Sequence, residues 1–299
     1  MKDYIKKYLK THWIYYLFVL PFLVLFTVFV IIPVGMAMFY SFTYYNVLEP
    51  AEYIGAGNYV RLFTEDSIFL TALKNTLLIA LVTGPTSYLM CFFLAWMLND
   101  LGPRLRSVLT LAFYTPTMAT SVYVVWTYIF SGDRYGFING LLLRLNIINQ
   151  PIVFLKNPDY MMAVIITVTL WMSLGTSFLA FIAGFQGLDR TLFEAGAVEG
   201  IKNRWQELWY ITLPSMRPQL MFGAVMQISA AFSVGAVGDA LVGFPSVDYA
   251  THTVINHLTD YGTVRFELGY ACAIATVLFL MMFLMNQIVK AVLRRFNDA

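Results

Sequence analysis

The sequence is divided by long stretches that contain no Asp, Glu, Lys or Arg. Six of them stand out, at 11–48, 75–99, 107–132, 160–188, 218–238 and 268–289. Each holds or closely approaches the roughly 20 residues that an α-helix needs to cross a bilayer about 30 Å thick. A helix is the required form, because backbone groups in lipid must bond within their own segment.

We therefore expect an all-α integral membrane protein with six transmembrane helices in a single domain, 1–299. The expected spans are about 14–40, 74–98, 107–130, 160–185, 215–238 and 268–290. Gly84-Pro85 is expected to interrupt the second span, because a proline removes a helical hydrogen bond. The apolar run of the first span is too long for a cleaved signal peptide, so we expect it to be retained.

Composition agrees with a membrane protein. The chain is 59% hydrophobic and only 12% charged, which lies outside the range of soluble globular proteins. Cys91 and Cys272 both fall inside predicted spans, so no disulfide framework is implied.

The basic residues are distributed unevenly between the two sides of the predicted spans. Most lie before the first span, after the second, after the fourth and at the end: Lys2, Lys6, Lys7, Lys10, Arg104, Arg106, Arg190, Lys202, Arg204, Arg217, Lys290, Arg294 and Arg295. Cytoplasmic loops of membrane proteins carry an excess of Lys and Arg. Both termini and the segment 186–213 are therefore expected to face the cytosol.

The segment 186–213 has the pattern of a short amphipathic helix with a glycine break. Apolar residues recur every three or four positions, at Leu188, Leu192, Ala195, Val198, Ile201, Trp205 and Leu208. Thr191 and Glu194 have the spacing of a capping box, which predicts a helix start there. Gly200 permits a bend, and Pro214 suits the first turn of the next helix.

The run Glu194-Ala195-Gly196-Ala197-Val198-Glu199-Gly200, followed by Trp205 and by Ile211-Thr212-Leu213-Pro214, resembles the EAA loop of ABC importer permeases. That motif is roughly E-A-A-x-x-D-G-A, then W, then I-x-L-P. The chain departs from it with Gly196 for the second alanine, Glu199 for aspartate and Ile201 for alanine. Its spacing from Gly200 to Pro214 is also one residue longer.

Two predicted external loops resemble carbohydrate permeases of the same superfamily. One carries Gly55 and Asn58-Tyr59, and the other carries Asp133-Arg134-Tyr135-Gly136 with Asn139. The resemblance implies a type I ABC importer permease in a bacterial or archaeal inner membrane. It also implies a second, homologous permease, an extracytoplasmic sugar-binding protein, and two cytosolic ATPases that hold the ATP and Mg²⁺. The residues that it assigns to ATPase coupling are Glu194, Ala195, Gly196, Glu199, Gly200, Trp205, Leu213 and Pro214.

The sequence lacks the motifs of several enzyme classes. It has no G-x-x-x-x-G-K-[ST] phosphate loop, no H-E-x-x-H zinc motif and no G-x-S-x-G elbow. We expect no catalytic residue, metal or cofactor in this chain and no nucleic-acid partner, so ATP hydrolysis belongs to another subunit. The charge-free spans argue against an ion-coupled carrier, which stays an alternative beside an ABC permease for a non-sugar solute.

A substrate path through these spans must use uncharged polar and aromatic groups. We expect Tyr114 and Trp171 to stack on sugar rings and Gln227 to face the bundle interior. An interhelical hydrogen bond is an equal alternative for Gln227. The wider set of candidates is Asn75, Thr76, Trp126, Ser177, Ser229 and Ser233.

Overall fold

The computed structural model describes the backbone of residues 2–119 and 122–298 and the side chains of 13–119 and 122–292. The chain forms two compact units, which we describe separately. The first unit comprises Met1–Glu65 and Leu258–Val277, and the second comprises Asp66–His257 and Leu278–Ala299.

The first unit begins with one long helical run. It consists of α1 (Lys2–Phe26), a π-helical turn η1 (Thr27–Ile31) and α2 (Ile32–Tyr40). The part Trp13–Tyr40 contains an 18-residue window with a mean hydropathy of 2.9, and none of its residues is buried. The predicted first span is thus present, but the helix begins at Lys2, so the basic leader is helical as well.

A small hairpin follows and corrects the all-α expectation. Strands β1 (Thr43–Tyr44) and β2 (Glu52–Tyr53) pair antiparallel, with Thr43 opposite Tyr53. The amide of Asn58, in α3 (Gly57–Thr64), donates to the carbonyls of Ser41 and Thr43 at 2.9 Å each. The strands are two residues long, too short for period-2 alternation to reveal them in the sequence.

In the rest of the first unit, the start of the last helix, α16 (Leu268–Asp298), packs against β1. A Cβ at Gly269 would lie 2.1 Å from the carbonyl oxygen of Thr43, so only glycine permits this approach. Arg61 forms an ion pair with Glu267 at 2.5 Å, and its guanidinium lies 4.2 Å from the ring centroid of Tyr270.

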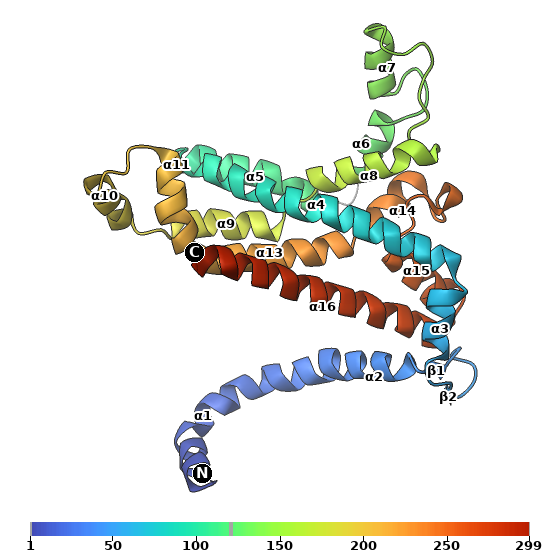
Figure 1. The fold of residues 1–299 in the computed structure, drawn as a ribbon, viewed down its shortest axis with the longest axis horizontal. Helices are drawn as coiled ribbons and strands as arrows, with labels where there is room; N and C mark the ends of the chain where they lie inside the picture. Colours follow the sequence, from blue (N-terminus) through green and yellow to red (C-terminus); the bar gives the residue numbers. More distant parts are fainter. Residues whose placement is uncertain (1, 120–121, 299) are drawn as a thin grey trace. The chain divides into compact units, whose positions relative to one another are not determined.

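The second unit is built around three helices that lie side by side (Figure 1). They are α4 (Ser67–Asn99), α9 (Thr176–Gln186) and α13 (Arg217–Phe232). Buried aromatic residues fill the space between them, including Phe92, Phe178, Phe181 and Phe185. Around them lie α5 (Pro103–Met118), α6 (Val122–Ile129), α7 (Phe137–Arg144), α8 (Pro158–Trp171), α14 (Ala236–Val242), η3 (Val247–Tyr249) and α15 (Val254–Thr259); η4 (Asp260–Val264) belongs to the first unit.

The helices agree with a multi-pass membrane protein. Within the described residues, four helices are long and apolar enough to span a bilayer, or up to six if two bent pairs each form one span. The pairs are α5 with α6 and α13 with α14, the latter bent by 41°. Residues 120–121, inside the third predicted span, lie outside the described residues.

Two breaks differ from those predicted. The helix α4 continues through Gly84-Pro85, because a single proline removes one hydrogen bond without ending a well-packed helix. The fourth predicted span is instead interrupted between α8 and α9. There the Ser173 hydroxyl donates to the Leu170 carbonyl at 2.6 Å, and the Gly175 N–H donates to the Ser173 carbonyl at 2.8 Å. These local bonds replace the helical ladder.

Candidate functional site

The segment 186–213, the loop segment below, folds into a chain of short helices. These are α10 (Arg190–Val198), α11 (Arg204–Glu207), a π-helical turn η2 (Leu208–Thr212) and the first residue of α12 (Leu213–Ser215). In Figure 1, α10 and α11 lie at one end of the second unit, beside the junction of α4 and α5, whereas α7 and α14 lie at the other end.

The start of α10 is set by Asp189 and not by the predicted capping box. Asp189 is the N-cap, and its carboxylate accepts from the Thr191 N–H at 3.0 Å. Hydrogen bonds from Thr191 lower the pKa of this exposed carboxyl. The capping-box prediction is wrong because Thr191 already lies inside the helix, where Asp189 supplies the cap.

The end of α10 has the geometry of a Schellman motif. Gly200 has a φ of +98°, its N–H donates to the Ala197 carbonyl at 3.3 Å, and the Ile201 N–H donates to the Gly196 carbonyl at 2.9 Å. Nothing lies within 4 Å of where a Gly200 Cβ would sit. The backbone conformation, rather than lack of space, therefore requires glycine there.

Two departures from the EAA pattern are neighbours in space. Gly196 is buried, and a Cβ there would lie 2.7 Å from Cδ1 of Ile211 and 3.0 Å from Cδ1 of Ile201. The larger Ile201, where the motif has alanine, thus occupies room that the smaller Gly196 leaves. We therefore expect the two substitutions to compensate partly for each other.

The π-helical turn η2 explains the longer spacing from Gly200 to Pro214, whereas nothing in the structure explains Glu199 in place of aspartate. The Leu213 N–H donates to the Leu208 carbonyl, an i to i+5 bond that encloses one residue more than an α-helical turn. The extra residue between Gly200 and Pro214 is absorbed there, and the helix continues into α12.

The helix α11 is tied to the end of α4. Arg204 forms an ion pair with Asp100, and its guanidinium lies 4.8 Å from the ring centroid of Trp96. The rings of Trp96 and Trp205 are 5.1 Å apart. The loop segment is therefore connected to the longest helix of the second unit through charge, cation–π and aromatic contacts.

Most of the predicted coupling residues are exposed, namely Glu194, Ala195, Glu199, Gly200, Trp205 and Pro214, whereas Gly196 is buried and Leu213 is half-buried. Val198, which was not among the predicted coupling residues, is 89% exposed. The apolar stripe that the sequence predicts thus faces partly outward. A surface of this kind suits docking to another protein.

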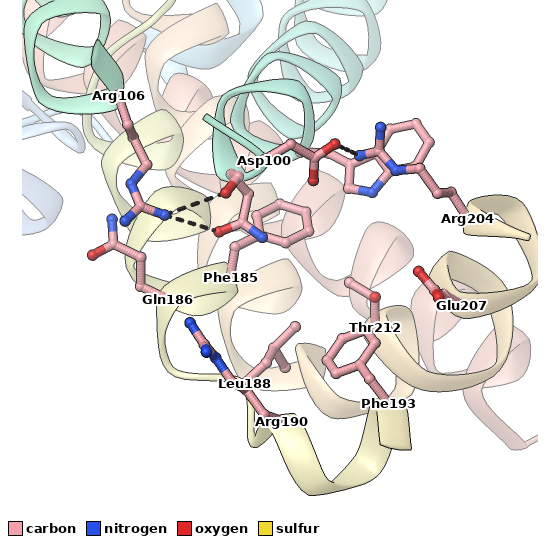
Figure 2. A pocket seen from close by; sticks show the side chains of 12 residues that line it. Asp100, Arg106, Phe185, Gln186, Leu188, Arg190, Phe193, Arg204, Glu207 and Thr212 are labelled. Carbon is pink, nitrogen blue, oxygen red and sulfur yellow. Dashed lines mark hydrogen bonds and ion pairs between the residues drawn. The ribbon is translucent and has the colours of Figure 1, made fainter. Parts of the chain in front are cut away.

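A cavity of about 330 Å³ lies between the loop segment and the α4–α5 junction (Figure 2). Its lining comprises Trp96, Asn99, Asp100, Arg106, Phe185, Gln186, Leu188, Arg190, Phe193, Arg204, Glu207 and Thr212. The sequence did not predict the cavity, because its residues come from two regions, 96–106 and 185–212, that lie far apart in the chain.

A second cavity, of about 270 Å³, lies in the helix bundle at the α8–α9 break. Gln227 lines it together with hydroxyl side chains: Thr83, Ser87, Thr117, Thr169, Ser173, Thr176 and Ser177. Gln227 is 5% exposed, and its amide nitrogen lies 3.2 Å from the Cys91 sulfur and 3.3 Å from the Ser173 carbonyl. Of these hydroxyls the sequence pointed only to Ser177.

The other pathway candidates are not gathered in this cavity. Tyr114 is half-buried and Trp171 is at the surface, where its ring packs 5.3 Å from that of Trp126. Asn75 and Thr76 form hydrogen bonds with backbone groups instead. Asn75 donates to the carbonyls of Tyr249 and His252, and Thr76 accepts from the Val254 N–H. Ser229 and Ser233 bond carbonyls one turn earlier in their own helix.

The carbohydrate-permease motif of the loop after α6 also forms hydrogen bonds with backbone groups. Asp133 accepts from the N–H groups of Tyr135 and Gly136, and the buried Asn139 bonds the backbone of Ser131 and Ile152. The pKa of Asp133 is lowered first by a hydrogen bond from the Ser131 hydroxyl and then by the bonds from the Gly136 and Tyr135 N–H groups. Tyr135, by contrast, is 87% exposed.

The family model of binding-protein-dependent transport system inner membrane components matches residues 87–298. The chain belongs to this family, which confirms the resemblance that the loop segment indicated. It is thus a component of an inner-membrane transport system.

Similar proteins agree with this family assignment, and a solved structure shares the fold. The probable ABC transporter permease protein YesP of Bacillus subtilis (strain 168) is 32% identical over 269 residues, 88% of this chain and 84% of that protein. The lactose transport system permease protein LacF of Rhizobium radiobacter is 29% identical over 212 residues, 70% of each chain. A bacterial alginate ABC transporter, crystallised with an alginate pentasaccharide-bound periplasmic protein, has a chain that superposes with a TM-score of 0.76 at 21% identity, over 98% of both chains.

Proposed function

We propose that this chain is a permease subunit of an ATP-driven, binding-protein-dependent sugar importer. The observation that carries the proposal is the loop segment, whose exposed apolar residues sit on helices tied to the end of α4. Sugar as the solute is supported by relatives named for lactose and by the structure named for alginate. A second, homologous permease, two cytosolic ATPases and an extracytoplasmic sugar-binding protein complete the proposed assembly.

In the proposed topology, six spans cross the membrane with the loop segment and both termini in the cytosol. The bent pairs α5–α6 and α13–α14 each count as one span. The basic residues beside the loop segment support the orientation.

The proposed coupling runs through contacts of the second unit. The ATPases engage α10 at Glu194, Ala195, Glu199 and Val198, while Gly196 and Gly200 shape its end. Movement of α11 is passed to α4 through Arg204 and the Trp96–Trp205 contact. ATP and the loaded binding protein then act by favouring different states of one membrane core.

The proposed pathway includes the hydroxyl-lined cavity at Gln227. Its lining has no charge and combines hydroxyl and amide groups with apolar side chains such as Met172, Met226 and Val237, which suits the hydroxyl groups and apolar faces of a neutral sugar. Tyr114 and Trp171 remain proposals for stacking contacts outside this cavity.

Reconstitution with the partner permease, ATPase and binding protein tests the docking role. Val198→Asp places a charge in the exposed apolar face, and we expect loss of ATPase association and of uptake while the chain still inserts. Leu48→Asp is a matched control, because Leu48 is 91% exposed in the first unit, far along the chain from the loop segment. Unchanged ATPase binding by Val198→Asp would contradict the proposal.

A panel of radiolabelled solutes in the same vesicles tests the substrate class. We expect ATP-dependent accumulation of a sugar and none of amino acids or phosphate. Accumulation of an amino acid or phosphate instead would leave the permease role standing and reject the sugar.

A further inference from the structure

The charged residues that line the cavity beside the loop segment are unevenly distributed. In the view of Figure 2, Gln186 lies between Arg106 and Arg190 on one side, whereas the Asp100–Arg204 pair and Glu207 lie on the other. Asp100 is already paired with Arg204. Among the described residues, no ion pair joins Arg106 or Arg190 to an acid.

The hydrogen bonds of Arg106 leave most of its donors available. It donates from one nitrogen to the backbone carbonyl and the side-chain oxygen of Asn99, at 3.4 and 3.3 Å. Both acceptors are neutral and both bonds are long. Because a guanidinium has five N–H donors, Arg106 keeps unused capacity.

The lining of the cavity is mainly polar, and Phe185, Leu188 and Phe193 supply its smaller apolar part. Arg106 is half-buried and Arg190 is exposed. Arginine binds carboxylates with two parallel hydrogen bonds. The volume of about 330 Å³ is enough for one acidic side chain with water.

We propose that Arg106 and Arg190 form a receptor for an acidic side chain of the partner ATPase. The proposal rests on the proposed docking role, because Arg190 is the first residue of α10 and the cavity adjoins that helix. The contact fixes α10 and α5 to the same ATPase residue. The two arginines select an acidic group, and the position of the cavity beside α10, where the ATPase is proposed to dock, makes the ATPase its source.

Carbodiimide crosslinking tests the carboxylate directly, since it joins a lysine amine to a nearby carboxylate. The experiment uses the assembled transporter in phosphatidylcholine nanodiscs, with Lys202→Arg to remove the lysine of the loop segment. We expect Arg190→Lys or Arg106→Lys to give a permease–ATPase adduct. The control is Arg104→Lys, an exposed position in the same turn of α5 that does not line the cavity. Adduct yields no higher than that of the control would overturn the proposal.

Affinity supplies the second measurement. We expect Arg106→Gln with Arg190→Gln to weaken ATPase association about tenfold or more, in line with loss of charged hydrogen bonds. An unchanged affinity would overturn the proposal. A loss seen only in bilayers with phosphatidylglycerol would also overturn it and assign the site to a lipid phosphate. If Val198→Asp abolishes association while the glutamine pair does not, the docking role stands and only the arginine receptor fails.

Discussion

At the scale of single residues, Gly200 is a position where the backbone conformation restricts the choice of residue. Its φ of +98° is unfavourable for residues with a Cβ, at about 1–2 kcal/mol, although the surrounding space is open. We expect transport and ATPase association to fall in the order Gly, Asn, Ala, Val, because asparagine tolerates this region best after glycine. Uptake assays on equal amounts of inserted protein give the order.

Lys202→Ala is the control for the Gly200 series, since Lys202 is exposed, lies two residues further along the chain and is not among the residues proposed to engage the ATPase. An order that follows side-chain volume alone, with asparagine worse than alanine, would contradict the conformational explanation. Bulk at Gly200 would then matter through a docked partner instead.

Gly196 and Ile201 provide a prediction about compensation. Gly196→Ala brings a methyl group within 3.0 Å of Ile201 and 2.7 Å of Ile211, and we expect a lower thermal stability. Adding Ile201→Ala should recover part of the loss, with a coupling energy of about 0.5–3 kcal/mol in a double-mutant cycle. Thermal unfolding of the four proteins measures it. Strictly additive effects would show that the two departures are unrelated.

The roles of the motif residues in the structure differ from the roles that the sequence suggested for them. Asp133, Asn139 and Asn58 were markers of a carbohydrate permease, and in the structure they bond the backbone of their own loops. Such bonds join residues up to 17 positions apart, which no local pattern encodes. Gln227 likewise bonds Cys91 and Ser173, the interhelical alternative that the sequence left open.

At the scale of elements, apolar length and charge predicted where helices lie, and local bonding decided where they break. Apolar runs identify α4 and α16 because burial in lipid needs only length and hydropathy. The continuity of α4 through Pro85 and the break at Ser173–Gly175 depend on neighbouring helices and hydroxyl bonds. Proline alone was therefore a poor guide to breaks.

The turn η2 leads to a deletion experiment. Removing Tyr210, which is exposed, should convert the π-helical turn into an α-helical turn and leave α11 and α12 in register. We expect ATPase association and uptake to be largely retained. Removing Ala197 from α10 rotates the residues after it by about 100° and should abolish both. Equal loss in the two deletions would contradict the inserted-residue explanation.

At the scale of the whole molecule, α4 is the element that joins the two ends of the second unit. Its 33 residues give a length of about 50 Å. Near its start, Asn75 and Thr76 bond the segment that follows α14, and after its last turn Asp100 pairs with Arg204 of α11. Because both ends are bonded to other segments, we expect a displacement of α11 to be transmitted along one continuous helix.

The proposed topology requires the two ends of the second unit to lie on opposite sides of the membrane. Val198 and Tyr135 are highly exposed at those ends, so each suits a single-cysteine probe. With Cys91 and Cys272 replaced by alanine, we expect an impermeant maleimide to label Tyr135→Cys in intact cells and Val198→Cys only in inverted vesicles. Labelling of Val198→Cys in intact cells would contradict the orientation, because an exposed cytosolic loop is shielded from an external reagent. It would also remove the basis for ATPase docking at α10. If both sites were labelled only in inverted vesicles, the external position of the Asp133–Asn139 loop would be rejected.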